Sequence, residues 1–262
     1  MTNSARRMLA PGPFTADQLP EESRYELVNG HPLHCEHAGG RHSTSNLTGG
    51  AALWSDLGVT EADVNAGYQL NASTVRAPDL AVGNVPNAPG WVQGAPPLAV
   101  EYEDRRQDKA ELATKITQLL KVETRYVWVV RLVGLPRVEV YEAGKAMRVV
   151  GLEKQLTAPG VLHHSVPVRA LFDQDAARAV VLRNLLARAG YEDLDAVRDE
   201  GRDKGREQGR DEGLRAAVRD LCELLAIDLT AERSALVAKL DRVGLDTLRT
   251  HLKAERRWPE GT

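Results

Sequence analysis

The chain has 262 residues, a formal net charge of −3 and 42% hydrophobic residues. These values are typical of a soluble globular protein and exclude a disordered or fibrous one. The mild acidity excludes a uniformly basic, histone-like nucleic-acid binder, but it allows an enzyme that holds a phosphate backbone through a local basic patch and a metal ion.

No apolar stretch approaches the roughly 20 residues that a membrane-spanning helix requires. The first residues include two arginines but no apolar segment of signal-peptide length. We therefore expect a cytoplasmic protein with no membrane partner. Cys35 and Cys222 lie far apart in the sequence, and their spacing does not indicate a disulfide framework.

A hairpin and a helix are predicted in the first sixty residues. Asn29-Gly30 lies between two short extended runs, and a type I′ turn favours this pair because it needs positive φ at both central residues. Residues 42–57 carry apolar side chains at helical spacing. Gly49 and Gly50 each weaken this helix by about 1 kcal/mol relative to alanine.

A strand–helix–strand unit is predicted for the middle of the chain. An apolar helix face over 108–122 lies between the apolar strand 97–103 and the β-branched and aromatic strand 125–132. Such a unit favours parallel pairing of its two strands. Further strands are predicted at 63–70, 75–82, 138–141, 146–150 and 166–171. The fold class is therefore α/β, with a mixed β-sheet flanked by helices.

The composition changes after Phe172, beyond which no strand is predicted. We expect a core domain at 1–173 and an all-α appendage at 174–262. A charged helix within it repeats glycine every four residues, at Gly201, Gly205, Gly209 and Gly213. The repeat indicates either a solvated, flexible helix or a bare face that another helix approaches closely. Apolar residues then follow at 4-3-4 spacing, as in a coiled-coil seam through which a homo-oligomer would form: Leu214, Val218, Leu221 and Leu225.

Two acidic residues lie in neighbouring predicted strands. Asp79 follows Pro78 inside one strand, and Glu101 lies at the end of the apolar run PLAVE. A carboxylate that ends a buried strand is costly unless it is paired or bound to a metal. Two such carboxylates form an oxygen site suited to Mg²⁺ or Mn²⁺. Alternatively, both carboxylates cap strands or pair with arginines.

Lys115 lies on the helix that follows the Glu101 strand. It shares a helix face with Asp108 and Glu111, which precede it by seven and four residues. This polar face either extends the acidic site or holds an ordinary surface ion pair between Glu111 and Lys115, which contributes little stability.

The segments YELVNG, APDLAV, PPLAVEYED, TRYVWVV and RVEVYEAG occur in this order, and LTAPGVLHHSVPVRALFD closes the core. This ordered set, with His42 opening the first long helix, resembles the Uma-two (Uma2) family of the PD-(D/E)xK nuclease superfamily. The resemblance covers about residues 14–173. It implies a restriction-endonuclease-like core and a metal-dependent endonuclease that hydrolyses phosphodiester bonds, with DNA as the expected substrate.

The resemblance also implies roles for individual residues. Asp79 matches the aspartate of the PD element, and Glu101 matches the acidic residue of the (D/E)xK element. The lysine slot two residues later holds Glu103, which departs from the superfamily pattern. Lys115 matches a lysine that the family places on the following helix. Glu26, in YELVNG, matches an acidic residue that joins the site from the N-terminal element.

In the implied chemistry, Asp79, Glu101 and the carbonyl after Glu101 hold one Mg²⁺ or Mn²⁺. Glu103 would be a further ligand, because strand alternation puts it on the same face as Glu101. Lys115 would orient the attacking water or stabilise the developing negative charge. Glu26 would hold a second ion or a metal-bound water.

Three basic residues are candidates for contact with substrate phosphates: His42, Arg105 and Arg106. The two arginines could equally neutralise the neighbouring carboxylates Glu103 and Asp104. Phosphate contacts of this kind would make binding depend on salt.

Two other functions compete with the nuclease. Glu103 in the lysine slot favours a catalytically degenerate nuclease fold that binds nucleic acid or a protein. A weaker hypothesis is a zinc-bound interaction protein, built on a cluster whose spacing matches no common zinc pattern: His31, His34, Cys35, His37 and His42.

Overall fold

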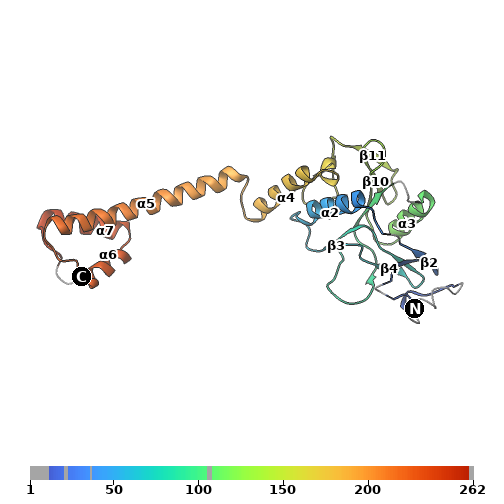
Figure 1. Cartoon of the computed structure of the whole chain (residues 1–262), viewed down its shortest axis with the longest axis horizontal. Helices are drawn as coiled ribbons and strands as arrows, with labels where there is room; N and C mark the ends of the chain where they lie inside the picture. Colours follow the sequence, from blue (N-terminus) through green and yellow to red (C-terminus); the bar gives the residue numbers. More distant parts are fainter. Residues whose placement is uncertain (1–11, 21–22, 36, 105–107, 260–262) are drawn as a thin grey trace. The chain divides into compact units, whose positions relative to one another are not determined.

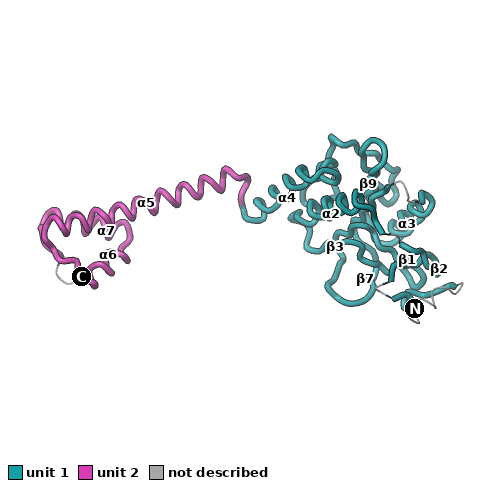
Figure 2. The backbone as a smooth tube through the Cα atoms, viewed as in Figure 1, with its two compact units in different colours: residues 1–190 teal, residues 191–262 magenta. Residues whose placement is uncertain are grey.

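The computed structural model describes residues 12–20, 23–35, 37–104 and 108–259. The chain divides into two compact units, residues 1–190 and 191–262 (Figure 2). The first unit contains one sheet of five strands, one of six and a pair of short strands. In the described part of the chain, no helix combines the length and the apolar character that a membrane span needs.

The six-stranded sheet has the order β11-β10-β9-β8-β6-β3. Strands β8 and β9 are parallel and α3 connects them, which confirms the predicted strand–helix–strand unit. The other neighbouring pairs are antiparallel. The elements are β3 (Ala62–Val64), β6 (Leu80–Val82), β8 (Leu98–Glu103), α3 (Lys109–Lys121), β9 (Tyr126–Arg131), β10 (Arg137–Glu142) and β11 (Arg148–Gly151).

The five-stranded sheet has the order β2-β1-β5-β4-β7. The predicted hairpin joins β1 to β2, and Asn29 and Gly30 have φ values of 50° and 82°. Both values are positive, as a type I′ turn requires. The strands are β1 (Tyr25–Val28), β2 (His31–His34), β4 (Tyr68–Asn71), β5 (Thr74–Arg76) and β7 (Val92–Gln93).

Each of the predicted strands 63–70 and 75–82 is divided between the two sheets. The second divides at Ala77-Pro78, where β5 ends and β6 is about to begin. Proline has no N–H to give to a strand ladder, so a break at this point is expected. The break places Arg76 in the five-stranded sheet and Asp79 beside the six-stranded one.

Helices cover both faces of the six-stranded sheet (Figure 1). Helices α2 (Gly40–Trp54) and α4 (Gln174–Arg188) pack on the face that carries Val100 and Tyr102. Helix α3 packs on the opposite face, against Ala99 and its neighbours. Since successive strand residues point to opposite faces, β8 and β9 are buried on both sides, which explains their continuous apolar runs.

The glycine pair in α2 allows a close approach between this helix and the sheet. A Cβ atom on Gly49 would lie 1.9 Å from the hydroxyl oxygen of Tyr102. A Cβ atom on Gly50 would lie 3.1 Å from a methyl carbon of Leu80. The cost of glycine to the helix is therefore offset by the burial of the whole Tyr102 ring.

The core extends beyond the expected boundary at residue 173. Ala177 and Val180 of α4 belong to the main hydrophobic core. Asn184 Nδ2 donates to Ser55 Oγ at 2.9 Å, and Arg188 donates to the carbonyl of Asp56. These contacts place α4 in the first compact unit, which ends at Gly190. The predicted strand 166–171 pairs only at β13 (Val166–Pro167), with β12 (Gln155–Leu156), and continues as the 3-10 helix η2 (Val168–Leu171).

The second unit consists of α5 (Leu194–Leu224), α6 (Ala231–Lys239) and α7 (Arg242–Glu255). The predicted seam on α5 packs against α6 and α7, with Val218 and Cys222 fully buried. The seam is thus used within one chain. The four repeat glycines lie on the exposed part of α5, and beyond the helix's own backbone and the adjacent residues no described atom lies within 4 Å of a Cβ added to any of them.

Candidate active site

Asp79 and Glu101 lie on neighbouring strands of the six-stranded sheet. Asp79 directly precedes β6, and Glu101 lies in β8. Leu80 pairs with Val100, so the antiparallel register places Asp79 one step further along, opposite Glu101. Residues directly opposite each other point to the same face of a sheet. The fold therefore places on neighbouring strands the two carboxylates that were predicted from the sequence to form one site.

Hydrogen bonds from two elements fix the Asp79 carboxylate. The backbone N–H of Tyr102 donates to Oδ2 at 2.7 Å, and Nε2 of His42 lies 3.1 Å from Oδ1. Asn46 donates from α2 to the backbone carbonyl of Asp79 at 3.2 Å. His42 is the third residue of α2, so the predicted phosphate-contacting residue lies beside the predicted metal ligand.

The ammonium group of Lys115 joins three groups at the site. Nζ lies 2.8 Å from Oε1 of Glu101 and 3.0 Å from Oε1 of Glu26, and it donates to the carbonyl of Ala77 at 2.8 Å. The side chain is almost fully buried. Lys115 therefore does not form the surface ion pair with Glu111 that was the alternative prediction.

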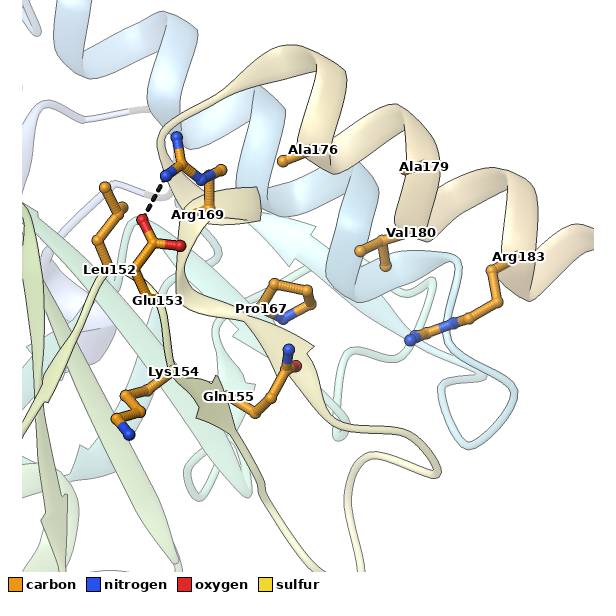
Figure 3. A pocket seen from close by; sticks show the side chains of 10 residues that line it. All are labelled: Leu152, Glu153, Lys154, Gln155, Pro167, Arg169, Ala176, Ala179, Val180 and Arg183. Atoms are coloured by element: carbon orange, nitrogen blue, oxygen red, sulfur yellow. Dashed lines mark hydrogen bonds and ion pairs between the residues drawn. The ribbon is translucent and has the colours of Figure 1, made fainter.

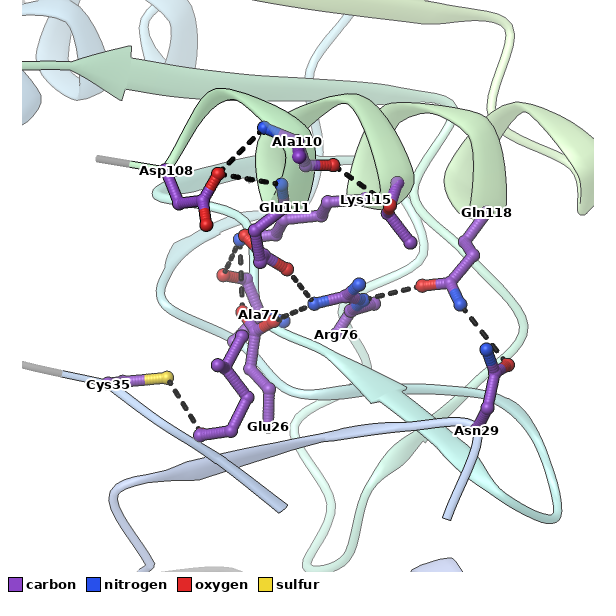
Figure 4. Close-up of polar contacts among 12 residues, drawn as sticks. Glu26, Asn29, Cys35, Arg76, Ala77, Asp108, Ala110, Glu111, Lys115 and Gln118 are labelled. Atoms are coloured by element: carbon purple, nitrogen blue, oxygen red, sulfur yellow. Dashed lines mark hydrogen bonds and ion pairs between the residues drawn. The ribbon is translucent and has the colours of Figure 1, made fainter. Parts of the chain in front are cut away.

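Arg76, at the end of β5, is the site residue that sequence reasoning missed. Its guanidinium is fully buried and contacts three side chains (Figure 4). Nη1 lies 2.7 Å from Oε2 of Glu26 and 2.5 Å from Oε1 of Glu111, while Nε donates to Oε1 of Gln118 at 2.7 Å. Arg76 therefore links β1 to α3. The sequence marks it only weakly, as an arginine between Val75 and Ala77, three residues before Asp79.

Burial and the two cations Lys115 and Arg76 shift the pKa values of the carboxyl groups at the site. Burial raises the pKa of Glu101 to about 8, with Lys115 acting to lower it and Asp79 to raise it. Burial disfavours the charged form of Lys115, but Glu101 and Glu26 outweigh it and raise the pKa, so the ammonium stays charged. Burial also opposes ionisation of Glu26, yet Lys115 and Arg76 hold its pKa below the usual value. The Asp79 hydrogen bond raises the pKa of His42.

Glu103 lies apart from this group. Although it shares a strand face with Glu101, its carboxylate forms an ion pair with Arg131. Arg131 also contacts Glu139 at 2.5 Å on the neighbouring strand. The structure therefore gives Glu103 an arginine partner in place of the metal that the resemblance implied.

Arg105 and Arg106 lie outside the described residues, so the structure does not test their predicted phosphate contacts. Next to them, Asp104 forms an ion pair with Arg41 of α2 at 2.5 Å. The zinc hypothesis finds no support in the described residues, where no group of three His, Cys, Asp or Glu side chains is placed to hold a metal ion.

A cavity of about 390 Å³ lies elsewhere in the first unit, between α4 and the β12–β13 pair (Figure 3). Arg169 and Arg183 line it, but both are engaged, with Glu153 and with the carbonyl of Ser165. The cavity contains none of the predicted site residues.

The site offers a divalent cation two carboxylates on neighbouring strands, Asp79 and Glu101, and the described residues contain no group of three His, Cys, Asp or Glu side chains placed to hold one. Four carboxylates, Glu26, Asp79, Glu101 and Glu111, accompany only two permanent cations, Arg76 and Lys115. Because burial raises the pKa of Glu101 to about 8, a cation bound by Asp79 and Glu101 would have to displace the Glu101 proton near neutral pH. Mg²⁺ usually keeps several waters and takes one or two protein carboxylates, so these two oxygen donors suffice without a third side chain.

Comparisons with known proteins agree with this architecture. Residues 14–171 match the model of the Uma2 family, described as "Putative restriction endonuclease". The fold resembles the crystal structure of a putative nuclease belonging to DUF820 from Anabaena variabilis ATCC 29413, with a TM-score of 0.54 and 20% identity. The match covers 62% of this chain and 99% of that one. No curated protein matches the chain.

Proposed function

Because the chain belongs to the Uma2 family of nuclease-like proteins, we propose that it is a divalent-metal-dependent endonuclease that hydrolyses phosphodiester bonds in DNA. The observation that carries this proposal is the joining of Asp79, Glu101 and Lys115. They come from three separate elements, and the Lys115 ammonium lies 2.8 Å from the Glu101 carboxylate. Two carboxylates can hold a divalent ion for metal-assisted hydrolysis, and a nearby lysine can stabilise the negative charge that develops on the phosphate.

Asp79 and Glu101 would hold Mg²⁺ or Mn²⁺, which when bound polarises the scissile phosphate and lowers the pKa of a coordinated water. Lys115, fixed by Glu26 and Glu101, places a positive charge where negative charge develops on the phosphate. Its three N–H groups already contact Glu101, Glu26 and the Ala77 carbonyl, and it stays protonated, so Lys115 acts through its positive charge rather than as a general base.

Two further residues have distinct roles in this proposal. Glu26 acts as the partner of Lys115 and not as the ligand of a second ion, because Arg76, Ala77 N–H and Lys115 already engage its oxygens. His42 fixes Asp79 and, when protonated, presents a positive charge at the N-terminal end of α2, where an anionic phosphate is favoured.

The experiment is cleavage of supercoiled plasmid DNA in Mg²⁺, in Mn²⁺ and with a chelator. The wild-type chain should cleave only when a divalent ion is present, and Asp79→Ala and Glu101→Ala should each abolish cleavage. Glu153→Gln, at an exposed ion pair, serves as the matched control and should cleave normally. Cleavage that survives both site substitutions would contradict the assignment.

A second function is favoured by one observation. The lysine slot holds Glu103, and Arg131 neutralises it, an arrangement compatible with a degenerate nuclease fold that binds nucleic acid or a protein. This function predicts metal-independent DNA binding, measured by fluorescence anisotropy, without cleavage under any of the ionic conditions above.

A further inference from the structure

We propose that Arg76 is a positioning residue that sets the place of the Lys115 ammonium, a role that rests on the nuclease function proposed above. Arg76 is fully buried at the end of β5. Its ion pairs and hydrogen bonds go to Glu26, Glu111 and Gln118. It therefore acts on the site through other residues, and two separate sets of contacts lead from it to Lys115.

The first set of contacts fixes the helix that carries Lys115. Glu111, Lys115 and Gln118 are spaced by four and three residues, so they share one face of α3. Arg76 contacts Glu111 one turn before Lys115 and Gln118 about one turn after it, at 2.5 Å and 2.7 Å (Figure 4). Because a guanidinium is planar and its donors are fixed, these contacts set the position of α3 along its own axis.

The second set of contacts fixes the carboxylate that faces Lys115. Arg76 contacts Oε2 of Glu26 at 2.7 Å, and the backbone N–H of Ala77 donates to Oε1 at 3.1 Å. The same Oε1 lies 3.0 Å from Nζ of Lys115. Arg76 thus turns one oxygen of Glu26 toward the ammonium. A lysine at this position would keep the charge but could not make the same forked contacts.

Arg76→Gln tests the proposal in the full-length chain. We expect kcat for plasmid cleavage to fall by about 100-fold, the cost that misplacing a catalytic group by 1 Å can carry. KM should stay unchanged, because Arg76 does not contact substrate, and Arg76→Lys should not restore kcat. In the Lys115→Ala background, Arg76→Gln should cause no further loss, because both changes remove the same contribution. If Arg76→Gln lowered kcat by the same factor in the wild-type chain and in the Lys115→Ala chain, the proposal would be overturned.

Arg188→Gln is the matched control, with rates expressed per folded molecule. Arg188 also links two elements, by donating to the backbone carbonyls of Asp56 and Val59, but it has no contact with the site. Its replacement should lower stability and leave kcat unchanged. A kcat loss equal to that of Arg76→Gln would show that Arg76 has only a general structural role.

Acylation of Lys115 by an amine-reactive ester, measured by peptide mass spectrometry, is a readout independent of cleavage. Exposed Lys121 on the same helix is the internal reference. Arg76→Gln should raise Lys115 labelling at least about tenfold, because burial and two ion pairs no longer protect the amine. Unchanged labelling would overturn the positioning role. Raised labelling in a chain that never cleaves DNA would reject the nuclease function and leave the positioning role standing.

Discussion

Among the described residues, Lys115 is the one cation in ion-pair contact with both Glu26 and Glu101. Its removal would leave two buried carboxylates facing each other without a positive charge between them. Breaking a buried ion pair in this way is far more costly than losing a surface pair. At the residue scale, the charge balance between Glu26 and Glu101 therefore depends on this single ammonium.

Replacing Lys115 with methionine keeps most of the side-chain volume and removes the charge. We expect cleavage to slow by about 10²–10³-fold, the usual effect of losing one preorganised group that stabilises charge in a transition state. Binding of Mn²⁺, followed by calorimetric titration, should persist because Asp79 and Glu101 remain. A variant that cleaves at the wild-type rate would remove Lys115 from the mechanism.

Glu139 offers a pH-dependent test of stability away from the proposed metal ligands. Burial opposes its ionisation, but Arg131 outweighs burial and holds the pKa of Glu139 below its usual value. A lowered pKa stabilises the fold above the unfolded pKa, and this stability is lost as the pH falls through the folded pKa. Glu139→Gln should therefore cost about 1.5–3 kcal/mol at neutral pH.

The difference between wild type and Glu139→Gln should vanish in acid, once the carboxylate is protonated in both states. Urea unfolding over a series of pH values measures it. A difference that grows as the pH falls would show that Arg131 does not stabilise the ionised form.

Sequence patterns identify the carboxylates and the lysine at the site, but not the arginine that orders them. An acidic residue that ends an apolar strand is costly, so Asp79 and Glu101 are conspicuous. Arg76 carries no such signal, because a basic residue at a strand end is usually solvated. Its role depends on Glu26 and Glu111 meeting from distant parts of the chain.

At the scale of elements, the packing of α2 on the sheet depends on a missing side chain. The hydroxyl of Tyr102 occupies the place of a Cβ atom at Gly49. Gly49→Ala should destabilise the first unit by about 1–3 kcal/mol, as overpacking does, despite its better helix propensity. Thermal unfolding measures the change.

Two matched variants test whether the contact between Gly49 and Tyr102 causes this destabilisation. Tyr102→Phe removes only a hydroxyl that has no hydrogen-bond partner among the described residues, and it should recover most of the stability lost in Gly49→Ala. Gly205→Ala, with open space around the new methyl group, should instead stabilise α5 by about 0.5–1 kcal/mol. A Gly49→Ala chain as stable as wild type would contradict the close packing.

Elements with strong local patterns could be predicted from the sequence, whereas those defined by tertiary contacts could not. The Asn29-Gly30 hairpin and the β8–α3–β9 unit have turn residues and periodicity that mark them. No comparable pattern in the sequence predicts that α4 packs on the core. Its hydrogen bonds run from Asn184 and Arg188 to Ser55, directly after α2, while Leu185 stays exposed, so apolar periodicity reveals only part of its packing.

At the scale of the whole molecule, the boundary after α4 predicts which truncated chains fold. A chain that ends at residue 190 retains Val180 and Asn184, which complete the core. We expect it to fold and to cleave DNA at the wild-type rate. A chain that ends at 173 should unfold cooperatively at a much lower temperature, as circular dichroism would show. Equal stability of the two fragments would restore the boundary expected from the sequence.

We propose that Asp79 and Glu101 hold the ion on which cleavage depends. The rate of plasmid cleavage over a range of Mn²⁺ concentrations, for wild type, Asp79→Asn and Glu101→Gln, tests this directly. We expect saturable activation of the wild type and none for either variant at any concentration. A variant that reaches the wild-type rate at the same Mn²⁺ concentration would contradict it.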